Sequence, residues 1–355
     1  MRDGRRILDA DAHVVEPAIA FGGIGVDGIL PVDLPATTPM IPCGDPARIA
    51  EQTAEGWSPA SYLRALDAEG IDACVLYPSV GLFVPFQPEL TATESARACR
   101  AYGEWITGYC AQGQGRLFGV GVLPLADPAL AAEEVRRSAA DGLVAVMARP
   151  NHLYGRNLGD PAYDAVFDAV EETGLALSVH EGLGVRGPTM GSERFTSFAA
   201  RHLFSHPVEQ MAALASLILD GALERHPGMG VAVLESGTGW LPWWLRRIDS
   251  HIDWMKGSET AGLSLTGREY FARQCVICTD PDDELAAWAA SEVGADHVMW
   301  ASDFPHPDAL YPHAVDSFLK EMAETHMPAE QLDAVLWETP LRAYSLAGRL
   351  AAAAP

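Results

Sequence analysis

The chain has 355 residues, of which 48% are hydrophobic and 20% are charged, and its 48 acidic against 24 basic side chains give a formal net charge of -24. Such a balance offers no basic surface to meet phosphates, so it argues against nucleic acid and anionic membranes as partners. No run of apolar residues is long enough to span a membrane, and no apolar leader precedes the first predicted strand. The six cysteines are scattered, as in proteins with reduced thiols. We therefore expect a globular cytoplasmic protein.

Eight short apolar runs rich in β-branched residues recur along the chain, and most of the segments between them have a helical pattern. The predicted strands are Ile7–His13, Ile71–Tyr77, Leu117–Leu123, Leu143–Ala148, Leu175–His180, Val231–Glu235, Cys275–Thr279 and Val298–Asp303. Helical patterns include Pro59–Glu69, Ala92–Gln112, Leu130–Asp141, Pro161–Thr173 and Pro281–Val293. Nearly continuous apolar strands that alternate with helices predict a parallel sheet covered on both faces. Eight such units in a chain of this length match one (β/α)8 TIM barrel.

The chain shows no linker that would divide it, so we expect residues 1–355 to form a single domain. The first connection between a strand and a helix, Val14–Ser58, is long and rich in Gly and Pro, and we interpret it as an insertion over the barrel mouth. Helical patterns at Ala314–His326 and Ala329–Leu346 close the barrel and extend beyond it.

Four potential metal ligands lie at the C-terminal ends of predicted strands. Asp11 and His13 are two residues apart on the first strand, so their side chains point the same way. His180 ends the fifth strand and Asp303 ends the eighth. Each residue alone has an ordinary explanation, because a lone His is often a hydrogen-bonded structural residue and a lone Asp is often a helix cap. Together, at the face where TIM barrels carry their active sites, they predict a divalent metal site suited to zinc or manganese.

The sequence resembles the amidohydrolase-related branch of the metal-dependent hydrolase superfamily, the branch that includes aminocarboxymuconate semialdehyde decarboxylase and γ-resorcylate decarboxylase. The resemblance extends over nearly the whole chain. It depends on the motifs at Asp9–Pro17, Ser178–Gly182, Leu234–Pro242, Arg246–Asp249 and Ser302–His306. Each motif is weak alone, and together they are specific for the branch.

This resemblance implies one divalent metal ion per subunit, zinc in the first place and manganese as the alternative, bound by Asp11, His13, His180 and Asp303. It implies a non-oxidative decarboxylase, a carbon–carbon lyase acting on a small aromatic or dienoic carboxylic acid. In that reaction Asp303 protonates a substrate carbon as carbon dioxide leaves. The family also implies a homodimer.

Two positions depart from the family pattern. The first ligand is His or Glu in family members and is Asp11 here, which is still a hard oxygen donor. Family decarboxylases carry a His at the end of the sixth strand, where this chain has Glu235. A carboxylate there could act as a general base, so the alternative function is a hydrolase that uses a metal-activated water on an amide, an ester, a lactone or the carbon–carbon bond of a β-diketone. A third possibility, a binding protein without metal, is disfavoured because all four ligand positions keep ligating residues.

Four further polar residues are candidates for the site. Arg149, after the fourth strand, could bind a substrate carboxylate through two parallel hydrogen bonds, or form an ion pair with an acidic loop residue. His206, which we expect just before a helix that begins near Val208, could contact substrate or pack in a loop. His306 lies beside Asp303 and is expected to bind substrate. Glu16 could orient a metal ligand or only begin the insertion.

Overall fold

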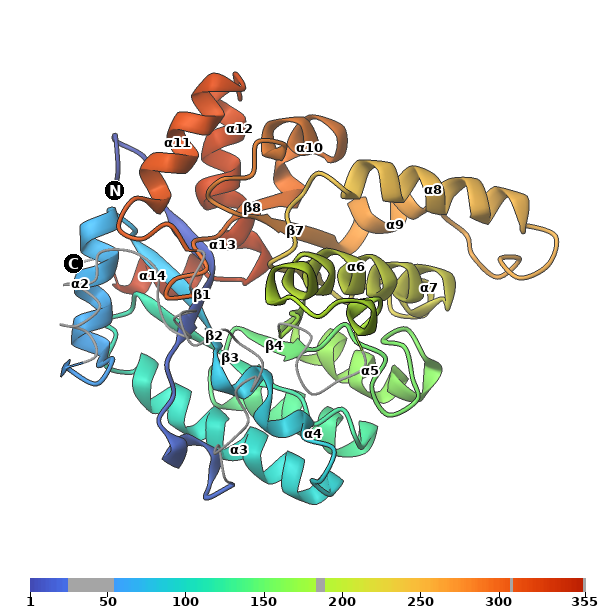
Figure 1. Cartoon of the computed structure of the whole chain (residues 1–355), viewed down its shortest axis with the longest axis horizontal. Coiled ribbons are helices and arrows are strands. Elements are labelled where there is room, and N and C mark those ends of the chain that lie inside the picture. The colour runs from blue at the N-terminus through green and yellow to red at the C-terminus, as the bar shows by residue number, and fades with distance from the viewer. Residues whose placement is uncertain (25–53, 183–188, 307–308, 354–355) are drawn as a thin grey trace.

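A computed structural model describes residues 1–24, 54–182, 189–306 and 309–353, and within them eight parallel strands form one sheet in the order β1 to β8 (Figure 1). The strands are β1 (Leu8–Val14), β2 (Ala73–Pro78), β3 (Leu117–Val122), β4 (Ala145–Ala148), β5 (Ala176–Val179), β6 (Val231–Val233), β7 (Cys275–Thr279) and β8 (Val298–Trp300). Every residue of these strands is buried. Complete burial explains why the strands are continuous apolar runs and do not alternate with polar residues.

Helices surround the sheet (Figure 1). They are α2 (Pro59–Glu69), α3 (Ala92–Cys110), α4 (Pro128–Ala140), α5 (Asp164–Thr173), α6 (Phe198–Leu219), α7 (Ala222–Arg225), α8 (Leu241–Trp254), α9 (Gly267–Gln274), α10 (Ala286–Val293), α11 (Ala314–Glu324), α12 (Ala329–Asp333), α13 (Thr339–Ala343) and α14 (Ala347–Ala353). Short 3-10 segments are η1 (Ala18–Phe21), η2 (Val80–Leu82), η3 (Val84–Phe86), η4 (Pro161–Tyr163), η5 (Ser192–Arg194) and η6 (Ala295–His297), and η7 (Ala334–Glu338) is a π-helix. Local capping fixes several of the helix ends, as in the capping box of Thr91 and Glu94 that begins α3.

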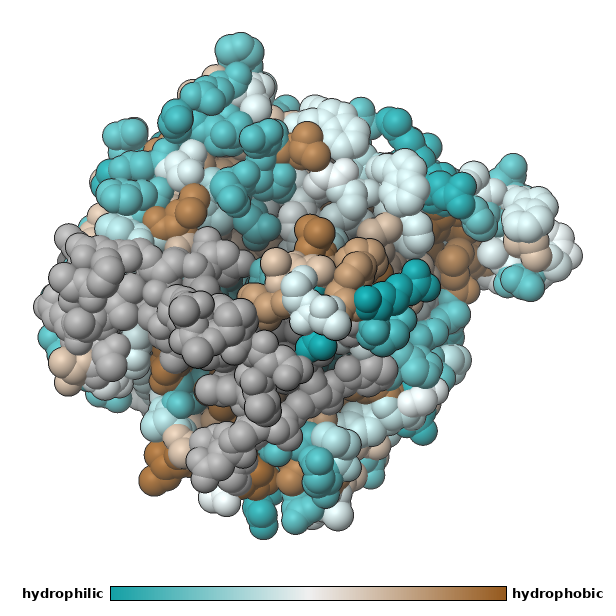
Figure 2. Space-filling view, in the orientation of Figure 1, coloured by the Kyte–Doolittle hydropathy of each residue, from teal (hydrophilic) through white to brown (hydrophobic). Residues whose placement is uncertain are grey.

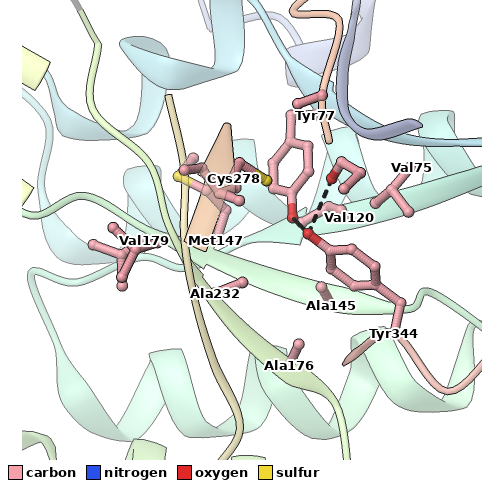
Figure 3. Close-up of a cluster of buried hydrophobic side chains, with 14 of the residues drawn as sticks. Val75, Tyr77, Val120, Ala145, Met147, Ala176, Val179, Ala232, Cys278 and Tyr344 are labelled. Atoms are coloured by element: carbon pink, nitrogen blue, oxygen red, sulfur yellow. Dashed lines mark hydrogen bonds between the residues drawn. The ribbon is translucent and has the colours of Figure 1, made fainter. Parts of the chain in front are cut away.

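Backbone hydrogen bonds just beyond β8 close the sheet into a barrel. The N–H of Asp303 donates to the carbonyl of Asp11 (3.0 Å), and the N–H of His13 donates to the carbonyl of Phe304 (2.7 Å). Inside the barrel, apolar side chains pack around two buried tyrosines (Figure 3). The hydroxyl groups of Tyr77 and Tyr344 lie 2.9 Å apart, so the segment after α13 contributes a side chain to the barrel interior. The expected TIM barrel is confirmed.

The structure changes some of the predicted boundaries. The helix expected to begin near Val208 begins at Phe198 and continues through Pro207, so that prediction is wrong. A proline inside a helix removes a backbone donor and usually ends the helix, which is why the sequence suggested a break there. Here the hydroxyl of Ser197 caps the earlier start by accepting a hydrogen bond from the N–H of Ala200 (3.3 Å). The single helix predicted for Ala329–Leu346 is divided by the π-helical turn of η7.

The connection that follows β1 is the long insertion expected from the sequence, since the next strand begins only at Ala73. Residues 25–53 of this insertion lie outside the described residues, so its position over the barrel mouth stays a prediction. None of the described helices is both long and apolar enough to cross a membrane. Hydrophilic residues dominate the surface over α11 and α12, in line with the net charge of -24 (Figure 2).

Candidate metal centre and active site

Four side chains from three strand ends converge at one point. The Nε2 atom of His13 lies 3.2 Å from Nε2 of His180 and 3.2 Å from Oδ1 of Asp303. Asp11 completes the group, with Oδ1 3.6 Å from Nε2 of His13 and Oδ2 3.5 Å from Nε2 of His180. Ligands held 2.0–2.2 Å from a tetrahedral zinc ion are roughly 3.3 Å apart, so Asp11, His13 and His180 have the spacing of one coordination shell, and Asp303 adjoins them through His13.

The two histidines present their Nε2 atoms to this cluster as neutral imidazoles. Nδ1 of His13 lies 2.8 Å from the carbonyl of Pro78, and Nδ1 of His180 lies 2.6 Å from the carbonyl of Glu181. Because a carbonyl only accepts, each Nδ1 carries the proton and each Nε2 keeps a lone pair. Burial lowers the pKa of His180 to about 4 and also lowers the pKa of His13, so both rings are neutral near pH 7.

Asp11 carries the observation that fits a cation best. Its side chain is buried, and neither carboxylate oxygen accepts a hydrogen bond from the part of the chain that the structure describes. Burial, reinforced by the carboxylates of Asp303 and Glu235, raises the pKa of Asp11 well above its usual range. A buried carboxylate without hydrogen bonds is costly, and a divalent ion among these donors would satisfy it.

The turn after β8 is built to hold Asp303 in place. Asp303 has a φ of 55°, in the left-handed region that residues other than glycine rarely adopt, and this conformation turns the chain immediately after the strand. Nδ1 of His306 lies 2.8 Å from Oδ1 of Asp303, while Nε2 of His306 lies 3.2 Å from the hydroxyl of Ser79. The structure therefore places His306 against a candidate metal ligand, and its role in substrate binding stays a prediction.

Asp9, which was not among the predicted site residues, holds the backbone next to Asp303 and the backbone of Asp11. One of its carboxylate oxygens accepts hydrogen bonds from the N–H of Ser302 (3.0 Å) and the N–H of Asp11 (3.3 Å), and the other oxygen accepts from the Ser302 hydroxyl. Burial raises the pKa of Asp9 to about 7. Its position two residues before Asp11 on the same strand was the available signal.

Glu235 lies between the metal cluster and helix α6. Its Oε2 atom is 3.4 Å from Nε2 of His180, and its Oε1 atom is 3.2 Å from Nε2 of His206. Burial opposes ionisation of Glu235, but the imidazole of His206 outweighs it and holds the pKa well below its usual range. Arg246, the nearest arginine after Glu235 in the sequence, contacts Glu292. Glu235 is an anion beside the cluster, with a φ of 40° that directs it there.

The helix that carries His206 is tied to the ends of β5 and β6. The side-chain amide of Gln210 donates to the carbonyls of Val179 (2.6 Å) and Leu234 (3.0 Å). His206 is four residues earlier and therefore lies on the same helix face. Placing His206 within reach of Glu235 depends on this tertiary contact, so the sequence could name the residue but not its neighbour.

Arg149 forms an ion pair with an acidic loop residue, which was one of the two roles predicted for it. The guanidinium is completely buried, and it donates to Glu181 Oε1 (3.0 Å) and to the Asn151 side-chain oxygen (2.9 Å). Glu181, which follows His180 directly, also accepts from the Asn151 amide at 2.8 Å. A role of Arg149 in substrate binding stays a prediction. Glu181 and Asn151 were not predicted as its partners, because contacts across two loops leave no local pattern.

Glu16 binds the loop after β2. Its carboxylate accepts hydrogen bonds from the N–H groups of Ser79 (3.0 Å), Val80 (3.0 Å) and Gly81 (2.9 Å), at the start of η2. Burial raises the pKa of Glu16 to about 7. The contact holds Ser79 next to His306, so Glu16 supports the centre through this loop.

A cavity of about 320 Å³ opens beside these groups. It is lined by His202, Leu203, His206, Pro207, Glu235, Ser236, Gly237, Asp280, Pro281, Asp282, Ser302, Asp303 and Ala309. A larger cavity of about 540 Å³ contains none of the candidate metal ligands in its described lining. The smaller cavity is therefore the better candidate for substrate, because Asp303 and Glu235 face it and small-molecule sites combine a concave wall with a few polar groups.

Comparison with known proteins agrees with this geometry. The family profile described as amidohydrolase matches residues 8–346. A 2-amino-3-carboxymuconate-6-semialdehyde decarboxylase from Dictyostelium discoideum is 24% identical over 271 residues, which cover 76% of this chain and 73% of the relative. A γ-resorcylate decarboxylase from a Polaromonas strain is 25% identical over 263 residues, covering 72% of this chain and 79% of the relative.

Among solved structures, a 5-carboxyvanillate decarboxylase from Novosphingobium aromaticivorans, determined with bound manganese, superposes with a TM-score of 0.76. It is 18% identical, and the match covers 97% of this chain and 98% of that one. At this identity the likeness shows the shared fold. The family profile extends over nearly the whole barrel and includes all four strand-end ligands and Glu235. The chain belongs to the amidohydrolase family.

Proposed function

We propose that this protein is a metal-dependent, non-oxidative decarboxylase of a small aromatic or dienoic carboxylic acid. The observation that carries the proposal is the group formed by Asp11, His13 and His180, with Asp303 3.2 Å from His13 and facing a cavity of about 320 Å³. Two imidazoles and two carboxylates suit zinc or manganese. The manganese bound in the 5-carboxyvanillate decarboxylase structure supports manganese. Both curated relatives described above are decarboxylases.

A bound divalent ion would supply Lewis acidity to a substrate oxygen. Asp303 then has the position of the proton donor, since it borders the cavity and is in contact with His306. Its proton passes to the carbon that bears the carboxylate, the bond from that carbon to the carboxylate breaks, and the bonding electrons return to the conjugated system. Carbon dioxide leaves, and Asp303 regains a proton from solvent through the mouth of the cavity.

A hydrolase is the second candidate, and the ionised state of Glu235 favours it. An anionic carboxylate beside the metal cluster can accept a proton from water, which is the step that hydrolysis of an amide, an ester, a lactone or a β-diketone requires. The decarboxylase is preferred because of the relatives, while the residue at the end of β6 supports the alternative. The homodimer and the cytoplasmic location expected from the sequence stay predictions.

The test uses matched pairs of compounds. Protein reconstituted with Mn²⁺ or Zn²⁺ is incubated with a panel of hydroxylated aromatic acids and dienoic acids, and with the methyl ester of each. A decarboxylase releases carbon dioxide from an acid, leaves its ester intact, and in D₂O yields a product with deuterium at the carbon that lost the carboxylate. Cleavage of esters without carbon dioxide from any acid would reject the lyase and favour the hydrolase. Asp303→Asn is the matched control for metal-catalysed background release.

A further inference from the structure

Three side chains form a second group of potential ligands on the cavity side of Glu235. His202 and His206 are four residues apart on α6, so they share one helix face, and their ring centroids are 4.7 Å apart. Ligand atoms of His202, His206 and Glu235 all lie within 4.8 Å of one another. Two histidines at this helical spacing with a carboxylate form a donor set that divalent metals use.

One distance within the group equals a distance in the first cluster. Nε2 of His206 lies 3.2 Å from Oε1 of Glu235, the same separation as between the Nε2 atoms of His13 and His180. The two oxygens of Glu235 also face different ways, because Oε2 lies toward His180 while Oε1 lies toward His206. A carboxylate in this position can donate one oxygen to each of two neighbouring cations.

The charge of the cavity gives an independent reason for a second cation. Its described lining includes the acidic residues Glu235, Asp280, Asp282 and Asp303, and contains no Lys or Arg. Arg149 is fully buried against Glu181. An anionic substrate entering this cavity would meet carboxylates, and a single ion among Asp11 and Asp303 has its charge largely balanced by its own ligands.

We propose that His202, His206 and Glu235 bind a second divalent cation, which receives the carboxylate of the substrate. The site itself follows from the geometry of α6 and β6, while its role toward a carboxylate rests on the proposed function. With three protein donors, and with His202 only half-buried, this site binds metal more weakly than the four-residue centre. Glu235 is then the shared ligand, which explains a carboxylate at the end of β6 where an imidazole could serve only one ion.

The competing explanation is a simple hydrogen bond between a protonated His206 and Glu235. Such a bond satisfies both side chains without a metal. The two explanations differ in stoichiometry, because the hydrogen bond predicts no further metal and no dependence of metal content on His202.

The experiment measures metal binding directly. Protein dialysed against metal-free buffer is titrated with Mn²⁺, and bound metal is counted by elemental analysis while electron paramagnetic resonance reports coupling between ions. We expect about one ion that survives dialysis and about one more that binds on titration, with a spin-coupled signal from the shared carboxylate. His202→Ala should lose the added ion and the coupled signal while keeping the first ion. His251→Ala, which removes a half-buried histidine of α8 that does not line the cavity, should keep both.

Wild-type protein that takes up no added ion, or His202→Ala that still takes it up, overturns the inference. His202→Asn is a second variant with a smaller change in shape, and the melting temperature of each variant checks that it is folded. The first ion is tested separately by His180→Ala. A retained first ion with no second one rejects this inference and leaves the proposed function standing, whereas the absence of any bound metal rejects both.

Discussion

The β1–β8 side of the barrel mouth and the β6–α6 side both direct ionisable residues at the same cavity, but they are built differently. On the first side, Asp11, His13 and Asp303 are held by backbone hydrogen bonds that close the barrel. On the second side, Glu235 lies in a left-handed turn, as Asp303 does, but its partner His206 comes from a helix. The comparison teaches that the candidate metal ligands follow the strands of the barrel directly. Glu235 and His206, on which the choice between lyase and hydrolase depends, are placed by a loop and a helix.

The largest effect on the first side is expected from Asp303→Asn. The amide keeps an oxygen donor but cannot release a proton to substrate, so turnover should fall roughly 10²- to 10⁴-fold while most of the metal stays bound. Steady-state rates and elemental analysis on one sample measure both quantities. Turnover near that of the wild type would show that Asp303 is only a ligand.

Glu235→Gln applies the same change to the second side. If Glu235 accepts or holds a proton, the rate should fall by about 10²-fold or more with the melting temperature nearly unchanged. If its role is structural, the contacts with His206 and His180 are weakened and the loss appears in thermal stability with turnover kept. Loss of the dialysis-stable ion would show that the first ion cannot be held by the strand-end residues without Glu235.

Arg149→Met tests whether the β4 side contributes structure or substrate binding. The substitution leaves Glu181 buried without its cation, so the free energy of unfolding should drop by about 3–5 kcal/mol. Turnover of the folded fraction should change by less than about tenfold. Denaturant unfolding and the KM for the acid are measured together, and a raised KM with full stability would return Arg149 to a substrate-binding role.

The smallest effect is expected from Ser79→Ala, which removes the hydroxyl 3.2 Å from Nε2 of His306. A single hydrogen bond of this kind contributes about 1 kcal/mol, so turnover should fall by less than about tenfold. His306→Ala serves as the matched comparison, because it removes the whole imidazole from Asp303. Equal losses in the two variants would mean that Ser79 has a role beyond orienting this ring.

The site residues that the sequence predicted share one property. The direction of each side chain follows from the strand pattern of the residues around it. Asp11 and His13 alternate along one strand, and His180 and Asp303 directly follow apolar runs, so the barrel pattern alone brings them together. His202 was missed because Pro207 concealed the helix that places it four residues before His206. The contact between Arg149 and Glu181 forms where two loops meet, and no repeating pattern in the sequence predicts such a contact.

The central claim is that the strand-end cluster binds a divalent ion, and metal analysis after exhaustive dialysis tests it most directly. Wild-type protein and the control His251→Ala should each retain about one ion per chain, and His180→Ala should retain almost none because it loses a ligand grouped with Asp11 and His13. Protein that holds no stoichiometric metal, and takes up neither Zn²⁺ nor Mn²⁺ on reconstitution, would contradict the account.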